Sequence, residues 1–170
     1  HYYSEIVEFE GMASATPGNE RIVYLQTTTP GYFRVMGIGL RRGRLLEETD
    51  SKESQPVTVV NEALVRRYFP NENPIGKRIR HEKTWHTIVG VVGDVRHLKL
   101  HEGISPEAYF PYTQSRWWSN ANLVIRANRD LDGLAGLVRP ELRALDKTWL
   151  VREVRTMEDL IATCVAPERL

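Results

Sequence analysis

The longest apolar run of this chain covers residues 87–92, which is far short of the ~20 residues that cross a bilayer. A run of this length is typical of a buried strand. The 170 residues are numerous enough to bury a core without a disulfide or a metal. The single cysteine, Cys164, excludes an internal disulfide. The chain is therefore expected to build its core from short strands and amphipathic helices.

The first half of the sequence predicts mainly strands. Alternating polar and apolar residues predict strands over residues 4–10 and 21–27, joined in a hairpin by a Pro17-Gly18-Asn19 turn. A β-branched run at residues 57–60 predicts a further strand, and Asn61 is placed to cap a helix that ends at Pro70.

Three further elements are predicted before residue 113. Thr29 is placed to cap a short helix over residues 32–36 that Gly37 ends. Residues 76–80 and 84–92 predict a second hairpin, and a last strand is expected over residues 107–112.

The C-terminal part of the sequence, over residues 122–164, predicts alternating strands and helices in the order β-α-β-α. Strands are predicted over residues 122–127 and 150–154, and helices over residues 130–145 and 157–164. Pro140 predicts a kink in the first of these helices, or a late start. Thr156 and Asp159 have the spacing of a capping box. The whole pattern indicates an α+β fold.

The charges are balanced, with 23 Lys and Arg against 22 Asp and Glu. Seven arginines at positions 41, 42, 44, 66, 67, 78 and 80 have acidic residues interleaved among them, which disfavours a nucleic-acid surface. The charged segment over residues 41–50 is expected to be a solvated strand and loop.

A catalytic or metal site has few candidates. His97 and His101 are four residues apart, and Asp94 follows a buried-looking strand, so a small metal-dependent hydrolase is one alternative. A complete ligand set is absent, and Asp94 is better explained as a turn residue whose carboxylate accepts hydrogen bonds from backbone amides. The four histidines at positions 81, 86, 97 and 101 are expected to be scattered over the surface. No phosphate-binding loop or dinucleotide fingerprint occurs, so no cofactor is predicted.

Trp117 and Trp118 form the least expected feature, since two large apolar rings lie within a polar segment. They are candidates for contact with a partner protein or a membrane interface, and the alternative is that one ring packs beneath the domain. Cys164 is predicted to lie on the apolar side of its helix and to be inert.

An ordered set of motifs over residues 24–112 resembles the MacB-like periplasmic core domain of FtsX-like ABC-transporter permeases. The motifs begin with Thr29-Pro30-Gly31-Tyr32-Phe33 and continue at residues 34–38, 42–44, 56–63, 67–70, 73–79, 88–96 and 109–112. Residues 113–170 resemble the family more loosely. Residues 1–23 match it only in their pattern of polar and apolar residues.

The resemblance implies a porter-like β-α-β subdomain formed by residues 1–27 and 113–170, with a smaller, mostly-β (Sabre-like) subdomain inserted at residues 28–112. It implies a periplasmic location at the cytoplasmic (inner) membrane, no catalytic residues, and coupling of transmembrane motion to export. The implied partners are a cytoplasmic ATPase, a periplasmic protein and a second copy of the permease. The chain lacks a starting Met and a signal peptide, so we expect a piece of a longer protein whose porter-like half lacks its first part. A free-standing ligand-binding domain is the remaining alternative.

Overall fold

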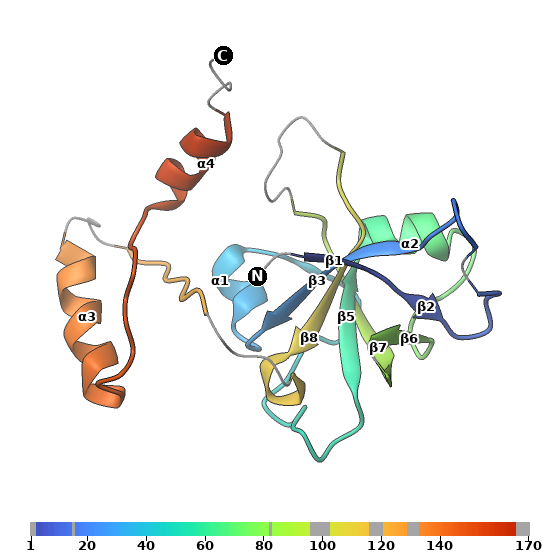
Figure 1. The fold of residues 1–170 in the computed structure, drawn as a ribbon, viewed down its shortest axis with the longest axis horizontal. Helices are drawn as coiled ribbons and strands as arrows, with labels where there is room; N and C mark the ends of the chain where they lie inside the picture. Colours follow the sequence, from blue (N-terminus) through green and yellow to red (C-terminus); the bar gives the residue numbers. More distant parts are fainter. Residues whose placement is uncertain are drawn as a thin grey trace. The chain divides into compact units, whose positions relative to one another are not determined.

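The computed structural model describes residues 3–14, 16–81, 83–95, 103–115, 121–128 and 133–165. The chain divides into two compact units (Figure 1). Residues 1–95 and 103–124 make up the sheet unit, and residues 96–102 and 125–170 make up the helical unit. No helix in the described ranges combines the length and apolarity of a bilayer-spanning segment.

The described part of the sheet unit contains one sheet of eight strands. Its order is β1-β3-β8-β5-β7-β6-β2, with β4 paired to β7 beside this path. The strands are β1 (Tyr3–Ile6), β2 (Glu8–Phe9), β3 (Ile22–Thr28), β4 (Leu40–Gly43), β5 (Val57–Asn61), β6 (Arg78–His81), β7 (Thr84–Val92) and β8 (Glu107–Pro111). Together with its helices, this sheet confirms the predicted α+β fold.

Both predicted hairpins are present, but the first was wrong at residues 8–9, which pair with β6 as a separate strand. The strand β1 pairs antiparallel with β3, and β6 pairs antiparallel with β7. Two parallel pairs, β3 with β8 and β5 with β7, join segments that are far apart in the sequence. Parallel neighbours need crossover connections, and α2 (Glu62–Tyr68) lies in the connection from β5 to β7.

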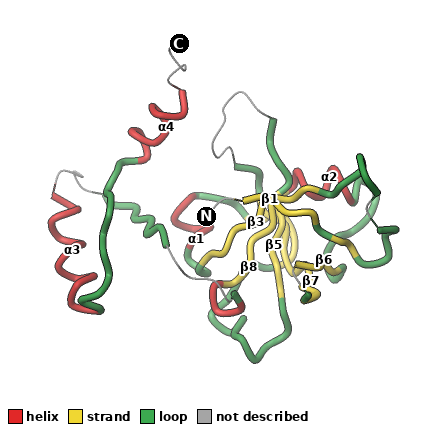
Figure 2. The backbone as a smooth tube through the Cα atoms, in the orientation of Figure 1, coloured by secondary structure: helices red, strands yellow, loops and turns green. Residues whose placement is uncertain are grey.

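The two ends of the sheet belong to one short segment of chain. The strands β1 and β2 stand at opposite ends of the strand order, yet only Val7 separates them in the sequence. The sheet therefore curls so that its ends approach one another (Figures 1 and 2). Val7 is fully buried, and its N–H donates to the carbonyl of Arg21 at 3.0 Å.

Two apolar clusters form the core, because successive residues of a buried strand point to opposite faces. Val60 belongs to a cluster that includes Leu64 and Phe69 beside α2. Its neighbour Val59 belongs to the other cluster, which includes Phe33 of α1 (Tyr32–Met36). Each helix thus packs on a different set of strand side chains.

Of the three residues predicted to cap or end a helix, two are confirmed. The Asn61 side chain accepts from the N–H of Leu64, and Gly37 ends α1 in the left-handed conformation at φ 72°. The predicted Thr29 cap is wrong, because Gly31 is the N-cap of α1. Only the backbone carbonyl of Thr29 takes part there, accepting from the N–H of Tyr32.

The close approach of β4 to β7 depends on two glycines. A Cβ at Gly90 would lie 1.9 Å from the carbonyl oxygen of Arg44, and one at Gly43 would lie 2.1 Å from that of Val89. No side chain fits at either position without a backbone shift. These contacts set where the chain leaves β4 and enters the loop after Arg44.

The helical unit contains α3 (Leu134–Leu145) and α4 (Met157–Val165). The helix α3 begins after its N-cap Gly133 and has Pro140 in its interior, so the predicted kink or late start stays a prediction. Thr156 Oγ1 accepts from the N–H of Asp159 at 3.0 Å, and Asp159 Oδ2 accepts from the N–H of Thr156 at 3.3 Å, which confirms the capping box.

The two strands predicted in the tail are wrong, because residues 122–127 and 150–154 have no strand pairing among the described residues. Several large apolar side chains of this part of the chain are also exposed: Leu123, Ile125, Leu137, Leu145, Trp149, Leu150, Val154, Met157, Leu160 and Ile161. A strand-like sequence needs a neighbouring strand to pair with, and an apolar helix face needs an apolar surface to pack on. The described residues of this part of the chain do not supply these to one another.

The predicted division into subdomains stays a prediction. Its first boundary, between residues 27 and 28, falls within β3, which pairs with β1 on one side and β8 on the other.

Candidate functional site

Asp94 lies after β7, where its carboxylate meets the first turn of α2. Its Oδ1 accepts from the N–H of Ala63 at 2.7 Å, and its Oδ2 accepts from Arg66 Nη2 at 2.6 Å. A carboxylate is favoured at a helix N-terminus, where backbone N–H groups lack partners within the helix. The predicted bond to a backbone amide is confirmed, and both oxygens serve to join β7 to α2.

The metal alternative involved Asp94 with His97 and His101. Both histidines lie outside the described residues. In the described ranges, no three His, Cys, Asp or Glu side chains are grouped to hold a metal ion.

The histidines of the β6–β7 hairpin do not match the expectation of scattered surface residues. His86 is 7% exposed, and its ring lies 4.8 Å from that of Phe110. His81 lies 2.9 Å from the Glu5 carboxylate across the ends of the sheet. The expectation was wrong because a hairpin next to the core buries one of its two faces.

Ion pairs join β2 to β6 on the outer surface. Arg80 Nη1 donates to Glu8 Oε2 at 2.9 Å, and Arg78 Nε donates to Glu10 Oε2 at 2.9 Å. The hydrogen bond from Arg78, followed by its positive charge, holds the pKa of the Glu10 carboxyl below its usual value. Two of the seven arginines are thus paired with acidic side chains.

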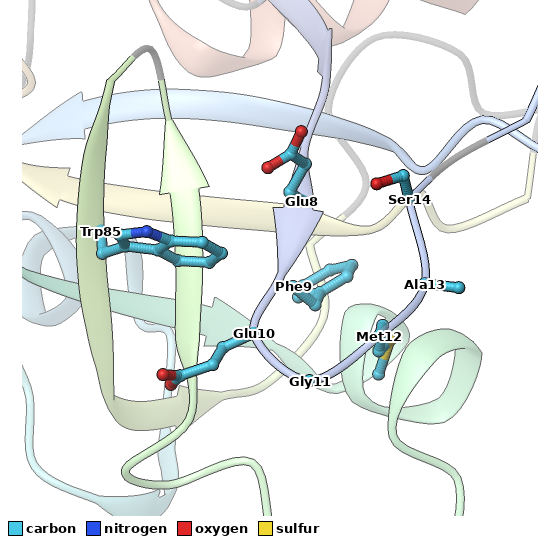
Figure 3. Close-up of a pocket in the computed structure, with 8 residues that line it drawn as sticks. All are labelled: Glu8, Phe9, Glu10, Gly11, Met12, Ala13, Ser14 and Trp85. Atoms are coloured by element: carbon cyan, nitrogen blue, oxygen red, sulfur yellow. The ribbon is translucent and has the colours of Figure 1, made fainter.

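Trp85 lies beside these ion pairs on β7. The two guanidinium groups of Arg78 and Arg80 are 5.7 and 6.0 Å from its ring. The indole forms one side of a hollow of about 210 Å³, and the opposite side is the chain from Glu8 to Ser14 (Figure 3). The hollow is large enough for a single side chain.

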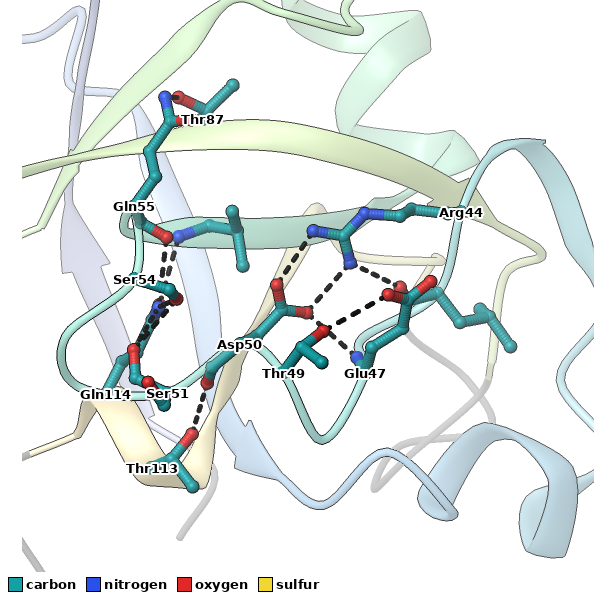
Figure 4. Close-up of polar contacts among 12 residues, drawn as sticks. Arg44, Glu47, Thr49, Asp50, Ser51, Ser54, Gln55, Thr87, Thr113 and Gln114 are labelled. Atoms are coloured by element: carbon teal, nitrogen blue, oxygen red, sulfur yellow. Dashed lines mark hydrogen bonds and ion pairs between the residues drawn. The ribbon is translucent and has the colours of Figure 1, made fainter.

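A half-buried ion pair organises the loop after β4. Arg44 Nη1 and Nη2 donate to the two oxygens of Asp50 at 2.8 and 2.7 Å, and the N–H of Glu47 donates to Asp50 Oδ2 at 2.8 Å (Figure 4). Burial alone would raise the pKa of Asp50. The hydrogen bonds and charge of Arg44, with the Glu47 N–H, outweigh burial and lower that pKa.

The same loop is attached to the end of β8. Gln114 Nε2 donates to the carbonyls of Ser51 and Gln55 at 2.9 and 3.0 Å, and its Oε1 accepts from the N–H of Val57 at 3.0 Å (Figure 4). Thr113 Oγ1 also donates to the carbonyl of Asp50. Residues 44–57 are therefore held as one piece against the sheet, and the predicted solvated loop is wrong at Asp50, which is 4% exposed.

Buried polar groups also tie α2 to β8. Asn61 Oδ1 accepts from the N–H groups of Leu64 and Glu107, both at 2.9 Å, and Asn61 Nδ2 donates to the carbonyl of Ser105 at 2.8 Å. The Tyr109 hydroxyl donates to Glu107, which is 1% exposed. Burial, helped by the negative charge of Glu107, raises the pKa of Tyr32 to about 12.

Sequence reasoning missed the buried positions of Asp50 and Glu107. The change from arginines to acids between residues 44 and 50 was a signal for the first, because it allows a local ion pair. Nothing in the sequence pointed to the burial of Glu107. The predicted contact residues Trp117 and Trp118 lie outside the described residues, as does the Cys164 side chain.

The chain is similar to parts of curated permeases. The protein named "Macrolide export ATP-binding/permease protein MacB" of Aggregatibacter actinomycetemcomitans is 40% identical over 82 residues, which is 48% of this chain and 13% of that protein. Its namesake in Neisseria gonorrhoeae is 38% identical over 61 residues, which is 36% of this chain and 10% of that protein. The chain thus corresponds to a small part of either relative.

The fold has a counterpart among solved structures. The crystal structure of the periplasmic region of MacB from Actinobacillus actinomycetemcomitans matches 85% of this chain with a TM-score of 0.61, at 24% identity and over 64% of that region. This likeness supports the α+β fold alone. The model of the family described as "MacB-like periplasmic core domain" matches residues 3–140. Because that match covers most of the 170 residues, the chain belongs to the family of MacB-like periplasmic core domains.

Proposed function

We propose that this chain is the periplasmic domain of an inner-membrane ABC-transporter permease and couples transmembrane motion to substrate export or to a partner protein. In this proposal it has no active site of its own, and a cytoplasmic ATPase supplies the energy. The observation that carries the proposal is that the carboxylates that are the best candidates for reactive groups form structural hydrogen bonds. The Asp94 carboxylate joins β7 to α2, and the Asp50 carboxylate joins the loop after β4 to Arg44. The Glu107 carboxylate accepts from the hydroxyl of Tyr109 on the same strand.

Such ties suit a part that transmits force. A coupling domain must move as one piece, so polar groups that fix its loops to its sheet contribute directly. The loop over residues 44–57 and the first turn of α2 are both held in this way, by Gln114 and Asp94. The named relatives, which are ATP-binding/permease proteins for macrolide export, are consistent with this role.

The proposal includes a contact surface and an assembly. Trp117 and Trp118 would touch a periplasmic partner or the membrane interface, because aromatic side chains are favoured in both places. The intact permease would act as a homodimer.

The subdomain division is also part of the proposal. Residues 1–27 and 113–170 would belong to a porter-like subdomain, and residues 28–112 to the inserted mostly-β subdomain. The exposed apolar side chains of α3 and α4, such as Leu145 and Ile161, support it, because they need further packing partners.

The test uses the intact permease with its ATPase. Replacing the domain by a flexible linker should abolish macrolide export from cells while ATP hydrolysis by the purified protein continues. Normal export by the linker variant would refute the coupling role. The double substitution Trp117→Ala and Trp118→Ala should lower export about tenfold.

The control for the tryptophan pair is Ile104→Ala, which removes an apolar side chain that is 39% exposed in the sheet unit. Export should stay at the level of the unsubstituted permease in this variant. An equal loss in the control would show that the contact is not specific to Trp117 and Trp118.

A further inference from the structure

We propose that residues 3–10 form a strap of which residues 8–10 are releasable: the β2–β6 junction opens while the β1–β3 hairpin stays paired. Its use in coupling rests on the function proposed above, whereas its opening is a property of the sheet unit itself. The strap can separate at either junction, and the two junctions differ in length, in the ion pairs across them and in what lies behind them.

The first difference is the length of each ladder. Four residue pairs join β1 to β3, from Tyr3 opposite Leu25 to Ile6 opposite Ile22. Only two pairs join β2 to β6, Glu8 opposite Arg80 and Phe9 opposite Ile79. One backbone hydrogen bond extends the shorter ladder, from the N–H of Glu10 to the carbonyl of Arg78 at 3.0 Å.

The second difference is that exposed ion pairs cross the β2–β6 junction. The side chains of Glu8 and Arg80 are 47% and 42% exposed, and those of Glu10 and Arg78 are 43% and 44% exposed. Ion pairs this exposed lose little on separation, because water and salt replace each partner. The contact between Glu5 and His81 joins β1 to the end of β6 on the other side of Val7, so it stays in place when only residues 8–10 leave β6.

Phe9 is the main group that opposes opening. It is 2% exposed, and its ring lies 5.1 Å from Phe69 and 4.9 Å from Tyr68. The closed junction is therefore the resting state, held by one buried ring.

The third difference is the space around the junction. The hollow beside Trp85 runs along the chain from Glu8 to Ser14, so this stretch has no packed layer on that side (Figure 3). Gly11 follows with φ 77°, and a Cβ added there would meet no atom within 4 Å, which leaves room for this residue to rotate. Val7 and Gly11 thus mark the two ends of the movable part.

Amide hydrogen exchange on the 170-residue chain, resolved by NMR, tests the strap. After correction for intrinsic rates, the Glu10 amide should exchange about tenfold faster than the Val7 amide, which donates to Arg21 on the hairpin side. Added salt should speed exchange at Glu10 and leave Val7 unchanged, because only the opening junction depends on exposed ion pairs. Equal rates at Glu10 and Val7, or no response to salt, would overturn the proposal.

A disulfide provides the complementary test in a Cys164→Ser background. Glu8→Cys with Arg80→Cys places two cysteines on directly paired residues, and antiparallel partners at about 4.5–5.5 Å between Cα atoms can be bridged. The oxidised form should slow exchange at Glu10 to the rate at Val7, and reduction should reverse this. Oxidation without any slowing would contradict the strap.

The control bridge joins Ile6→Cys to Ile22→Cys, a paired and exposed position on the hairpin side. Oxidation there should leave Glu10 exchange fast. In the intact permease, export that is lost on oxidation of the 8–80 bridge and regained on reduction supports a role in coupling. Unchanged export would overturn that role alone, since the linker replacement tests the proposed function separately.

Discussion

The ion pair of Arg44 with Asp50 allows a sharp test of how the loop over residues 44–57 is held. The change is Asp50→Asn, which keeps the size of the side chain but removes its charge and part of its accepting capacity. Asp50 is 4% exposed and accepts three hydrogen bonds, two from Arg44 and one from the N–H of Glu47.

The expected loss follows from these contacts. Breaking a buried ion pair costs about 3–5 kcal/mol, because the remaining charge is left without its partner. The Arg44 side chain is 38% exposed and can regain water, which reduces the cost to about 2–3 kcal/mol. A loss of this size lowers the melting temperature by about 5–10 °C in a chain of this length.

Urea denaturation followed by circular dichroism measures the free energy of unfolding, with Glu48→Gln as the control. Glu48 is exposed on the same loop, so its substitution makes the same charge change without a buried partner. The double variant Arg44→Gln with Asp50→Asn should be more stable than the sum of the single losses predicts, since both act on one pair. A change below about 0.5 kcal/mol in Asp50→Asn would refute the argument that this pair holds the loop.

Three further outcomes are expected from urea denaturation. Gly90→Ala should cost about 2–4 kcal/mol because its Cβ meets the Arg44 carbonyl, whereas Gly103→Ala, with no atom within 4 Å, should be tolerated; equal effects would contradict this. Asn61→Ala should cost about 2–3 kcal/mol through a lost helix cap and an unpaired Glu107 N–H, and a near-neutral result would count against it. The lowered pKa of Asp50 means that the unfolded chain binds its proton more tightly, so stability should fall below about pH 4, with a shallower fall in Asp50→Asn.

The parts of the fold that the sequence predicted are those in which neighbours in sequence decide the structure. Residues 57–69 are an example, because a β-branched run, an Asn cap and the position of Pro70 act within a few residues of one another. The β6–β7 hairpin was predictable for the same reason, since a turn lies between its two strand patterns.

The errors have a different physical origin, because they depend on distant partners. The segments at residues 122–127 and 150–154 carry strand-like sequence but no pairing in the described part of the chain. The burial of Asp50 and Glu107 depends on groups such as Arg44 and Asn61 that the folded chain brings to them. A charged residue in a sequence pattern normally indicates solvent, so its burial is visible only when its partner is known.

The position of β1 and β2 at the two ends of the strand order also bears on aggregation. Exposed sheet edges invite strands from other molecules, and natural proteins limit this with short, charged edge strands. Here the terminal strands have only four and two residues, and the segment that forms them carries Glu5, Glu8 and Glu10. Loss of this one segment would uncover β3 and β6 together, leaving two unpaired edges for self-association.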